Sequence, residues 1–169
     1  MGAMVNGKAN FMTAANAGII GYDPPMLYVA SFKGHHTNAG VRKEKCFSVN
    51  IASSKLAAKV DYCGIVSGRS ADKSQLFKLF VGETGAPLID DCPVCFDCRL
   101  HKTMKFGHED VFIGEIVSIW VDGKCLDKDG KPDIRKIDPL IYSTSNRVYF
   151  QLGEPIGPAY SIGKRLKEE

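Results

Sequence analysis

Polar and apolar residues alternate in several short segments of the chain, and a period of two is typical of a β-strand with one buried face. The alternation runs through CFSVNI (46–51), VCFDCRL (94–100) and NRVYFQLG (146–153). Two more segments are apolar nearly throughout and rich in β-branched and aromatic residues, which also favours strands: MLYVASF (26–32) and VFIGEIVSIWVDG (111–123). We also predict a strand over NFMTAANAGII (10–20), although its alanines would suit a helix.

Helical patterns are fewer and shorter than strand patterns. Thr37 or Asn38 can cap a helix over 37–44, because both side chains are good N-caps. A second helix is predicted in SADKSQLFKLF (70–80), with Ser70 as its cap. These helices are too short to dominate the fold.

The segment SSKLAAKVDYCGI (53–65) predicts one more helix. It begins with the capping residues Ser53 and Ser54, and its apolar side chains recur on one face at Leu56, Val60 and Cys63. Residues 124–145 hold a polar loop, and we expect a short helical turn there before Pro139.

The order of these elements predicts a mainly β protein. We find no internal repeat and no linker, so residues 1–169 are expected to form a single domain. The helices do not alternate regularly with the strands, and neither GxGxxG nor GxxxxGK[ST] occurs, which argues against a doubly wound parallel sheet. We predict an antiparallel barrel or sandwich with a few short flanking helices.

Composition narrows the function classes. Hydrophobic residues make up 44% and charged residues 24%, and the formal net charge is +3. The basic residues are scattered rather than gathered in a stripe, so no nucleic-acid partner is expected. No apolar run approaches the roughly 20 residues of a membrane span, and no secretory signal opens the chain. We therefore expect a cytoplasmic protein with no membrane partner.

Six cysteines raise the question of a metal site. Cys92, Cys95 and Cys98 form the run CPVCFDC, which begins the bacterial ferredoxin pattern, but Lys102 stands where that pattern needs a fourth cysteine. On a strand, Cys95 and Cys98 would point to opposite faces. We interpret the three as packed free thiols, with a thiol–metal protein as the alternative.

Two polar segments suggest an anion site. The loop SFKGHHT (31–37) gathers Lys33, His35, His36 and Thr37 just before a predicted helix, where free backbone N–H groups attract negative charge. The segment DYCGIVSGRSADK (61–73) adds glycine and positive charge from Arg69 and Lys73. Taken alone, the first segment could instead be a solvated turn, and the second a helix cap with a surface ion pair. No GxSxG elbow or HExxH motif supports hydrolytic chemistry.

Taken in order, these segments resemble a known family. NFMTAANAGIIGYDPP, SFKGHHT, FSVNI, DYCGIVSGRSADK, GHEDVFIGEIV, LIYSTSNRVYFQLGEPIG and AYSIGK look like the flavoredoxin branch of the flavin reductase-like, FMN-binding split-barrel proteins. The resemblance spans residues 5 to about 164 of the sequence. It implies a Greek-key split barrel that forms a homodimer and binds FMN noncovalently near the dimer interface.

The resemblance also implies site residues. Thr37 matches the threonine on the phosphate side of the cofactor, and Lys73 matches the lysine of an SGRxxDK motif that reaches the cofactor. Asn10 matches an asparagine that faces the isoalloxazine ring, and His108 a histidine near the flavin. Phe150 or Tyr149 matches a ring at the far wall of the pocket. The full set of implied cofactor-binding positions is Asn10, Met12, Thr13, Ala14, Asn16, Ser31, Lys33, His36, Thr37, Ser67, Gly68, Lys73, His108 and Phe150.

The chain departs from the family pattern in two places. The family has a longer N-terminal segment with an apolar first strand, whereas this chain starts at MGAMVNGK, so residues 1–5 are expected to be a remnant of that strand. Such a loss would expose a sheet edge. Asn16 stands where many relatives have a tryptophan beside the flavin, so a more open flavin face is expected.

The function that follows is an FMN-dependent redox protein that takes electrons from NADH, NADPH or a redox protein partner. The flavin would carry the chemistry, so no side chain is assigned as a catalytic acid or base. The alternative is a non-enzymatic FMN-binding electron carrier that a protein partner reduces. The sequence does not separate the two, because the split barrel has no dedicated nicotinamide motif.

Overall fold

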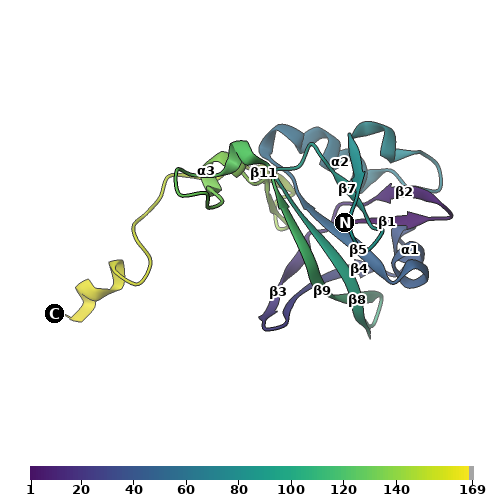
Figure 1. The fold of residues 1–169 in the computed structure, drawn as a ribbon, viewed down its shortest axis with the longest axis horizontal. Helices are drawn as coiled ribbons and strands as arrows, with labels where there is room; N and C mark the ends of the chain where they lie inside the picture. Colours follow the sequence, from purple (N-terminus) through teal and green to yellow (C-terminus); the bar gives the residue numbers. More distant parts are fainter. Residues whose placement is uncertain (168–169) are drawn as a thin grey trace.

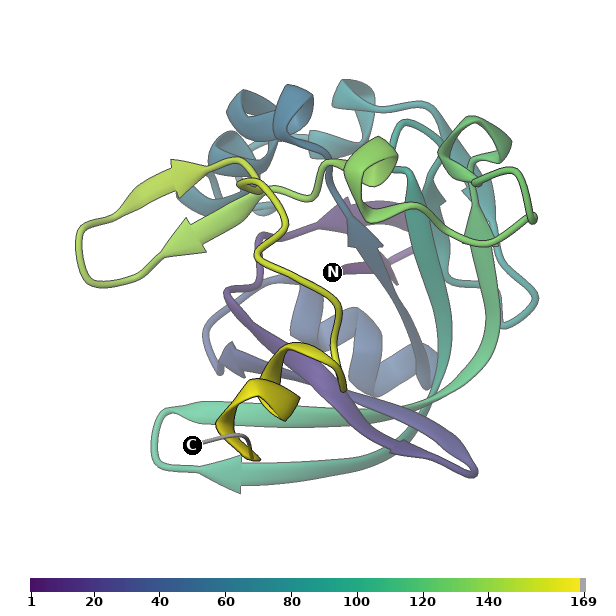
Figure 2. The same cartoon turned by 90° about the vertical axis from the view of Figure 1, so that its left-hand side faces the viewer.

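The structure is a computed structural model that describes residues 1–167. Its main element is a seven-stranded sheet in the order β2-β1-β5-β8-β9-β4-β3, in which every pairing is antiparallel. The strands are β1 (Gly2–Val5), β2 (Lys8–Phe11), β3 (Asn16–Tyr22), β4 (Pro25–Phe32), β5 (Cys46–Ile51), β8 (Val94–Phe106) and β9 (Glu109–Val121). Figure 2 shows the long strands curling around the interior. The prediction of a mainly β, antiparallel fold with short helices is confirmed.

Smaller elements surround this sheet. Two hairpins pair β6 (Leu79–Val81) with β7 (Pro87–Ile89) and β10 (Ile141–Ser143) with β11 (Val148–Phe150). The α-helices are α1 (Thr37–Glu44), α2 (Ala57–Ile65) and α3 (Ile134–Ile137). Short 3₁₀-helices are η1 (Ser54–Leu56), η2 (Lys73–Leu76), η3 (Gly123–Cys125) and η4 (Ile162–Lys167). In the described part of the chain, no helix combines the length and the apolar character that a membrane crossing requires.

The interior holds two main apolar clusters. One contains Val29, Phe47 and Phe112 between the curled strands and α1. The other contains Phe11 and Leu88 beneath α2 and β7. Helix α1 lies very close to β1, since a Cβ atom on Gly40 would lie 2.3 Å from the Met4 carbonyl oxygen. This close approach brings the start of α1 near strand β2, which forms part of the candidate site.

The predicted strand over 10–20 is wrong as a single element. The structure divides it into β2 and β3, which are the two edges of the seven-stranded sheet, with residues 12–15 between them. The chain must leave one edge and join the other, so the run cannot remain one strand. Residues 2–5, expected as a strand remnant, form β1 between β2 and β5.

The predicted helix over 70–80 is also mostly wrong. Only the 3₁₀ turn η2 forms there, capped by the Asp72 side chain through the Ser74 N–H. Leu79 and Phe80 instead pair with β7. Leu76, Phe77 and Phe80 would share one face of a helix, but Phe80 pairs in the hairpin instead.

The expected caps differ from the observed ones. His36 occupies the N-cap of α1, and Thr37 is the first helical residue. Neither expected serine caps α2 with its side chain: Ser53 makes no cap hydrogen bond, and the Ser54 hydroxyl donates to the Asp138 carboxylate. The helix over 37–44 and the turn before Pro139 nevertheless form where the pattern predicts them. The helix predicted over 53–65 forms as η1 followed by α2, which begins at Ala57.

All six cysteines are free and buried. Cys95 packs in the cluster beneath β7 and Cys98 in the cluster between the curled strands, as expected for side chains on opposite faces of β8. Burial raises the pKa of Cys92 to about 12 and that of Cys98 to about 12. Among the described residues, no group of three or more His, Cys, Asp or Glu side chains is arranged to hold a metal ion.

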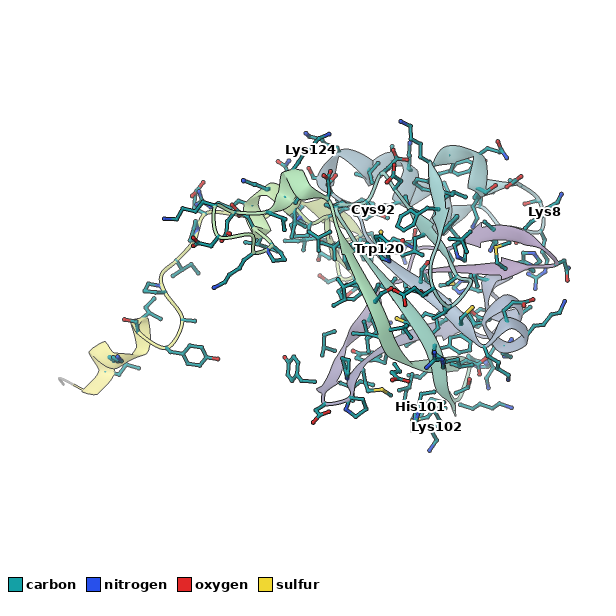
Figure 3. The ribbon with its side chains drawn as sticks, in the orientation of Figure 1. Lys8, Cys92, His101, Lys102, Trp120 and Lys124 are labelled. Carbon is teal, nitrogen blue, oxygen red and sulfur yellow. The ribbon has the colours of Figure 1, made fainter. Side chains whose placement is uncertain are left out.

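Charged residues are spread over the surface. Figure 3 shows Lys8, Lys102 and Lys124 at separate edges of the molecule, where each side chain is exposed.

The last described segment leaves the barrel after β11 and ends in η4, far from the sheet (Figure 1). It exposes large apolar side chains, with Ile156 94% and Tyr160 97% accessible.

Candidate functional site

Two adjoining cavities lie beside the connection between the sheet edges. One has a volume of about 480 Å³ and the other about 290 Å³. They share the lining residues Met12, Thr13, His35, Cys63, Gly64 and Ile65. We call the two together the cleft, with the larger cavity as its apolar end and the smaller as its polar end. Its size falls in the range of small-molecule and cofactor sites.

The polar end gathers residues from β2, the loop before α1 and the loop after α2. Eight of the predicted residues line one or both cavities at this end: Asn10, Met12, Thr13, His36, Thr37, Ser67, Gly68 and Lys73. The chain therefore brings together positions up to about 60 residues apart in sequence, as the family resemblance implies.

Asn10 and Thr37 join β2 to helix α1. The Asn10 Nδ2 donates to Thr37 Oγ1 at 2.7 Å, and both residues are buried. Because that hydroxyl oxygen already accepts, the Thr37 O–H proton remains able to donate to a ligand. Asn10 lies at the polar end of the cleft, next to Thr37, and its place beside a flavin ring stays a prediction.

Lys73 is held at the C-terminal end of α2. Its Nζ donates to the carbonyl oxygens of Cys63 at 3.0 Å and Val66 at 2.8 Å, and its residue is 3% exposed. An ammonium group has three N–H donors, so one remains for the cavity that Lys73 lines. Burial lowers the pKa of Lys73, which the neighbouring Cys63 thiol partly offsets. The interpretation of Lys73 as a solvated side chain does not hold.

The turn around Gly68 closes this end of the cleft. A Cβ atom at Gly68 would lie 2.0 Å from Asn10 Oδ1, so the turn packs directly against the Asn10 amide. Arg69 Nη1 donates to the Gly34 carbonyl at 3.0 Å and so connects the turn to the loop before α1. Gly68 therefore permits close packing against Asn10, and it also lines the cavity.

The start of α1 contributes to the same end. His36 and Thr37 line the cavity, and the N-cap residue makes no side-chain cap hydrogen bond. Helix N-termini carry partial positive charge, which favours an anionic group there. Arg69 and Lys73 add formal positive charge, so the polar end suits an anion such as a phosphate.

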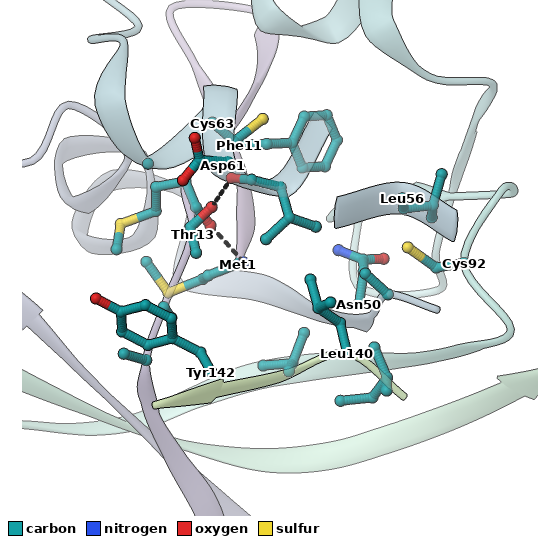
Figure 4. A pocket seen from close by; sticks show the side chains of 18 of the residues that line it. Met1, Phe11, Thr13, Asn50, Leu56, Asp61, Cys63, Cys92, Leu140 and Tyr142 are labelled. Carbon is teal, nitrogen blue, oxygen red and sulfur yellow. Dashed lines mark hydrogen bonds between the residues drawn. The ribbon is translucent and has the colours of Figure 1, made fainter. Parts of the chain in front are cut away.

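The apolar end is wider and mostly hydrocarbon. Figure 4 looks into it and shows Phe11 and Leu56 on its walls and Tyr142 at its edge. Its apolar lining also includes Val49, Ile51, Val60, Leu140 and the predicted Ala14. The Thr13 hydroxyl donates to the Val60 carbonyl, which ties the residues between β2 and β3 to α2. A flat, largely apolar ring fits this end better than a charged group.

Aromatic side chains from the β10–β11 hairpin border the apolar end. Tyr149 lines the cavity, and its hydroxyl donates to Asp61 Oδ1 at 3.1 Å. Burial and the Asp61 carboxylate raise the pKa of Tyr149. Phe150, the preferred residue of this pair in the sequence prediction, is 47% exposed and does not line the cleft. Strand alternation explains the difference, since neighbours on β11 face opposite ways.

Four more predicted residues lie outside the cleft lining. Asn16 is exposed on β3, and Ser31 is buried behind the loop that precedes α1. Lys33 Nζ donates to the Gly107 carbonyl at 2.5 Å, and the Lys33 N–H donates to the His108 carbonyl at 2.9 Å. These contacts place Lys33 and His108 at the β8–β9 turn in this chain.

The structure adds lining residues that were not among the predicted site positions. At the polar end they include Phe32, Gly34, His35, Val66 and Arg69. The charge of Arg69 was a usable signal in the sequence. His35 was indicated only as a member of the SFKGHHT loop. Phe32, Gly34 and Val66 were not recognisable, because such residues line a cavity only when distant segments close around it.

Comparisons with known proteins show the family and the fold of this chain. The family described as "Flavin reductase like domain" matches residues 2–152. Flavoredoxin from Methanosarcina acetivorans is 40% identical, with a TM-score of 0.94 over 98% of this chain and 89% of that chain. Flavoredoxin of Desulfovibrio vulgaris (Miyazaki F) is 34% identical, with a TM-score of 0.89 over 96% of this chain and 89% of that chain.

A curated relative adds a named activity. The protein named FMN reductase (NADH) RutF from Bradyrhizobium diazoefficiens is 28% identical over 138 residues, which are 75% of this chain and 73% of that protein. The predicted resemblance is thus confirmed by sequence and by structure. The chain belongs to the flavin reductase like domain family.

Proposed function

We propose that this chain binds FMN noncovalently in the cleft and acts as a flavin reductase-like redox protein. The observation that carries the proposal is the continuity of the cleft, in which a cationic, donor-rich end adjoins an apolar end. FMN has the matching division into a phosphate and a ring system. The names of the relatives, flavoredoxin and FMN reductase, support the same cofactor.

The residues present fit the cofactor on chemical grounds. Thr37, Arg69, Lys73 and the start of α1 would hold the phosphate, because they supply a hydroxyl, backbone N–H groups and positive charge. Two N–H groups of the Lys73 ammonium donate to backbone carbonyls, and the third is left for a phosphate oxygen. A buried donor without an acceptor is costly, so the phosphate would stabilise this arrangement. When bound, FMN supplies the redox chemistry.

The side chains of this chain then bind and orient the cofactor. The apolar walls around Phe11, Leu56 and Leu140 exclude water from one part of the ring. At position 16, many relatives have a tryptophan beside the flavin, whereas Asn16 has no ring and is exposed on β3. No aromatic side chain at this position would therefore cover the flavin. An uncovered face would admit an electron donor or acceptor.

NADH is the electron donor that we favour, because a relative with 28% identity carries the name FMN reductase (NADH). The test is steady-state oxidation of NADH and of NADPH by the purified chain with added FMN. Turnover with NADH supports the reductase. Tight FMN binding without turnover on either nucleotide supports the alternative, an electron carrier that a redox protein partner reduces.

A homodimer is part of the proposal. Ile156 and Tyr160 are almost fully exposed on the segment that extends from the barrel (Figure 1), and large apolar side chains favour burial against another surface. A second copy of the chain is the occupant that we favour, because soluble oligomers are mostly symmetric assemblies of identical chains. Light scattering should give the mass of two chains, and a monomer that binds FMN tightly would contradict the dimer.

Six free thiols also agree with a reducing compartment such as the cytoplasm. Fractionation of the source cells followed by immunodetection of the chain tests this location.

A further inference from the structure

His35 lies where the two ends of the cleft meet. It lines both cavities, and its ring packs edge-on against Phe32, with centroids 6.0 Å apart and planes at 74°. The sequence indicated His36 and His108 as cofactor-binding histidines, and His35 only as a member of the SFKGHHT loop. The surroundings of His35 give it a more specific role.

A chain of hydrogen bonds fixes the orientation of a buried amide behind the loop. Asn38 Nδ2 donates to the Phe32 carbonyl at 3.0 Å, so Asn38 Oδ1 faces Ser31. The Ser31 hydroxyl donates to that oxygen at 2.8 Å. Asn38 and Ser31 are 0% and 2% exposed, so water does not compete for these groups.

The same chain fixes the proton on the histidine ring. Ser31 has one hydroxyl proton, and it donates the hydrogen bond to Asn38 Oδ1 with that proton. Toward His35 Nδ1, at 3.0 Å, the Ser31 oxygen then acts as the acceptor. Two other acceptors are within reach of the Ser31 hydroxyl: His35 Nδ1 itself, if that nitrogen carries no proton, and the Met12 sulfur at 3.5 Å, a weak acceptor. Either choice would leave the buried Asn38 Oδ1 without this donor, which is costly. The contacts therefore favour the His35 tautomer with its proton on Nδ1.

Such a ring offers a lone pair on Nε2. Burial lowers the pKa of His35; Lys73 lowers it further, and Glu109 opposes this. The neutral form is favoured accordingly. Around it the polar end presents mostly donors, from Lys73, Arg69 and the start of α1, so His35 supplies an acceptor among donors.

We propose that His35 is a cofactor-binding residue whose Nε2 accepts a hydrogen bond from a ribityl hydroxyl of FMN. The proposal rests on the proposed function. A phosphate at the polar end and a ring at the apolar end require the polyol chain to cross the junction where His35 lies. A hydroxyl buried there needs an acceptor. Ser31 and Asn38 are positioning residues that act through the ring of His35.

The first test is nitrogen NMR of the histidine rings in the protein without flavin. The expected result is His35 protonated on Nδ1 and bare on Nε2. Ser31→Ala should redistribute the proton between the two nitrogens, a change that a merely structural serine would not cause. A wild-type ring protonated on Nε2 would overturn the proposal.

The second test compares two flavins. One is FMN, and the other is its analogue with a phosphopentyl chain that lacks the three hydroxyls. His35→Phe should weaken FMN binding by about fivefold to tenfold and leave the affinity for the analogue unchanged. His101→Phe, on an exposed position of β8, is the matched control and should change neither. Equal loss for both flavins would overturn the proposal, because His35 would then only shape the cleft.

Failure of the proposed function gives a different result. If the wild-type chain bound neither flavin, the FMN site itself would be rejected, while the ring protonation would still report on the Ser31 contact. If it bound both flavins equally well and His35→Phe changed nothing, the FMN site would stand and the role of His35 would fall.

Discussion

Asn10 and Thr37 are joined by a hydrogen bond of 2.7 Å between Nδ2 and Oγ1, which links strand β2 to the first residue of helix α1. Both residues are buried, so the bond is shielded from water. The contact places an amide and a hydroxyl side by side at the polar end of the cleft. The integrity of that end therefore depends on a pair of residues that are far apart in sequence.

Thr37→Val should weaken both the fold and FMN binding. Valine keeps the shape of the side chain but leaves Asn10 Nδ2 without its partner, at a cost of about 1–3 kcal/mol in the free energy of unfolding. FMN affinity should fall by roughly tenfold through the lost hydroxyl. Urea unfolding and fluorescence titration measure the two effects. Thr103→Val on β8 is the matched control, and an equal effect of both substitutions would contradict the assignment.

Lys73→Met should reduce FMN affinity more strongly. The methionine removes the charge that faces the phosphate, and hydrogen bonds to charged groups contribute about 1.5–3 kcal/mol. A loss of roughly 10-fold to 100-fold is expected by titration. Lys78→Met, at an exposed position, is the control. Unchanged affinity in Lys73→Met would remove the lysine from the site.

Gly68→Ala should disturb the site without touching any charged group. The new methyl would lie 2.0 Å from Asn10 Oδ1, so the turn or the amide must move. We expect a destabilisation of about 1–3 kcal/mol, typical of overpacking, and weaker FMN binding. Gly123→Ala is the matched control, because nothing lies within 4 Å of its added Cβ. A Gly68→Ala protein with full stability and affinity would show that this close packing has no role.

Alkaline pH should destabilise the fold through its buried thiols. Burial raises the pKa of Cys98 to about 12 from an ordinary value of 9.0, and that of Cys95 to about 11. Above about pH 9 the unfolded chain loses these protons while the folded chain keeps them. The free energy of unfolding should therefore fall as pH rises from about 9 towards 11.

Urea unfolding at several pH values measures this slope. Cys98→Ala should show a shallower decline than the wild type, because one of the shifted thiols is gone. Other groups that titrate in this range are common to both proteins and cancel in the comparison. Identical slopes would mean that the Cys98 thiol does not contribute.

The sequence predicted the elements whose pattern was local. The alternation in 46–51 and 94–100 and the apolar run 111–123 correspond to β5, β8 and β9. The short helix over 37–44 also formed, although its N-cap is His36 and not Thr37 or Asn38. In these places the burial of one face was encoded within the segment itself.

The predictions of secondary structure failed where pairing between distant segments determines the structure. Residues 10–20 belong to both edges of the sheet, and the break at 12–15 follows from the curling of the barrel. Leu76, Phe77 and Phe80 would share one face of a helix, but Phe80 has a strand partner in β7. For the site, the segments around Thr37 and Lys73 were indicated by their charge and hydroxyl content. The roles of His35 and of the Gly68–Asn10 contact depend on packing that no local pattern records.

Titration of the flavin-free protein with FMN, followed by flavin fluorescence, tests the account most directly. The account predicts saturable binding of one FMN per chain, weakened by Thr37→Val and Lys73→Met but not by Thr103→Val or Lys78→Met. Absence of saturable binding, or equal binding by all four variants, would contradict it.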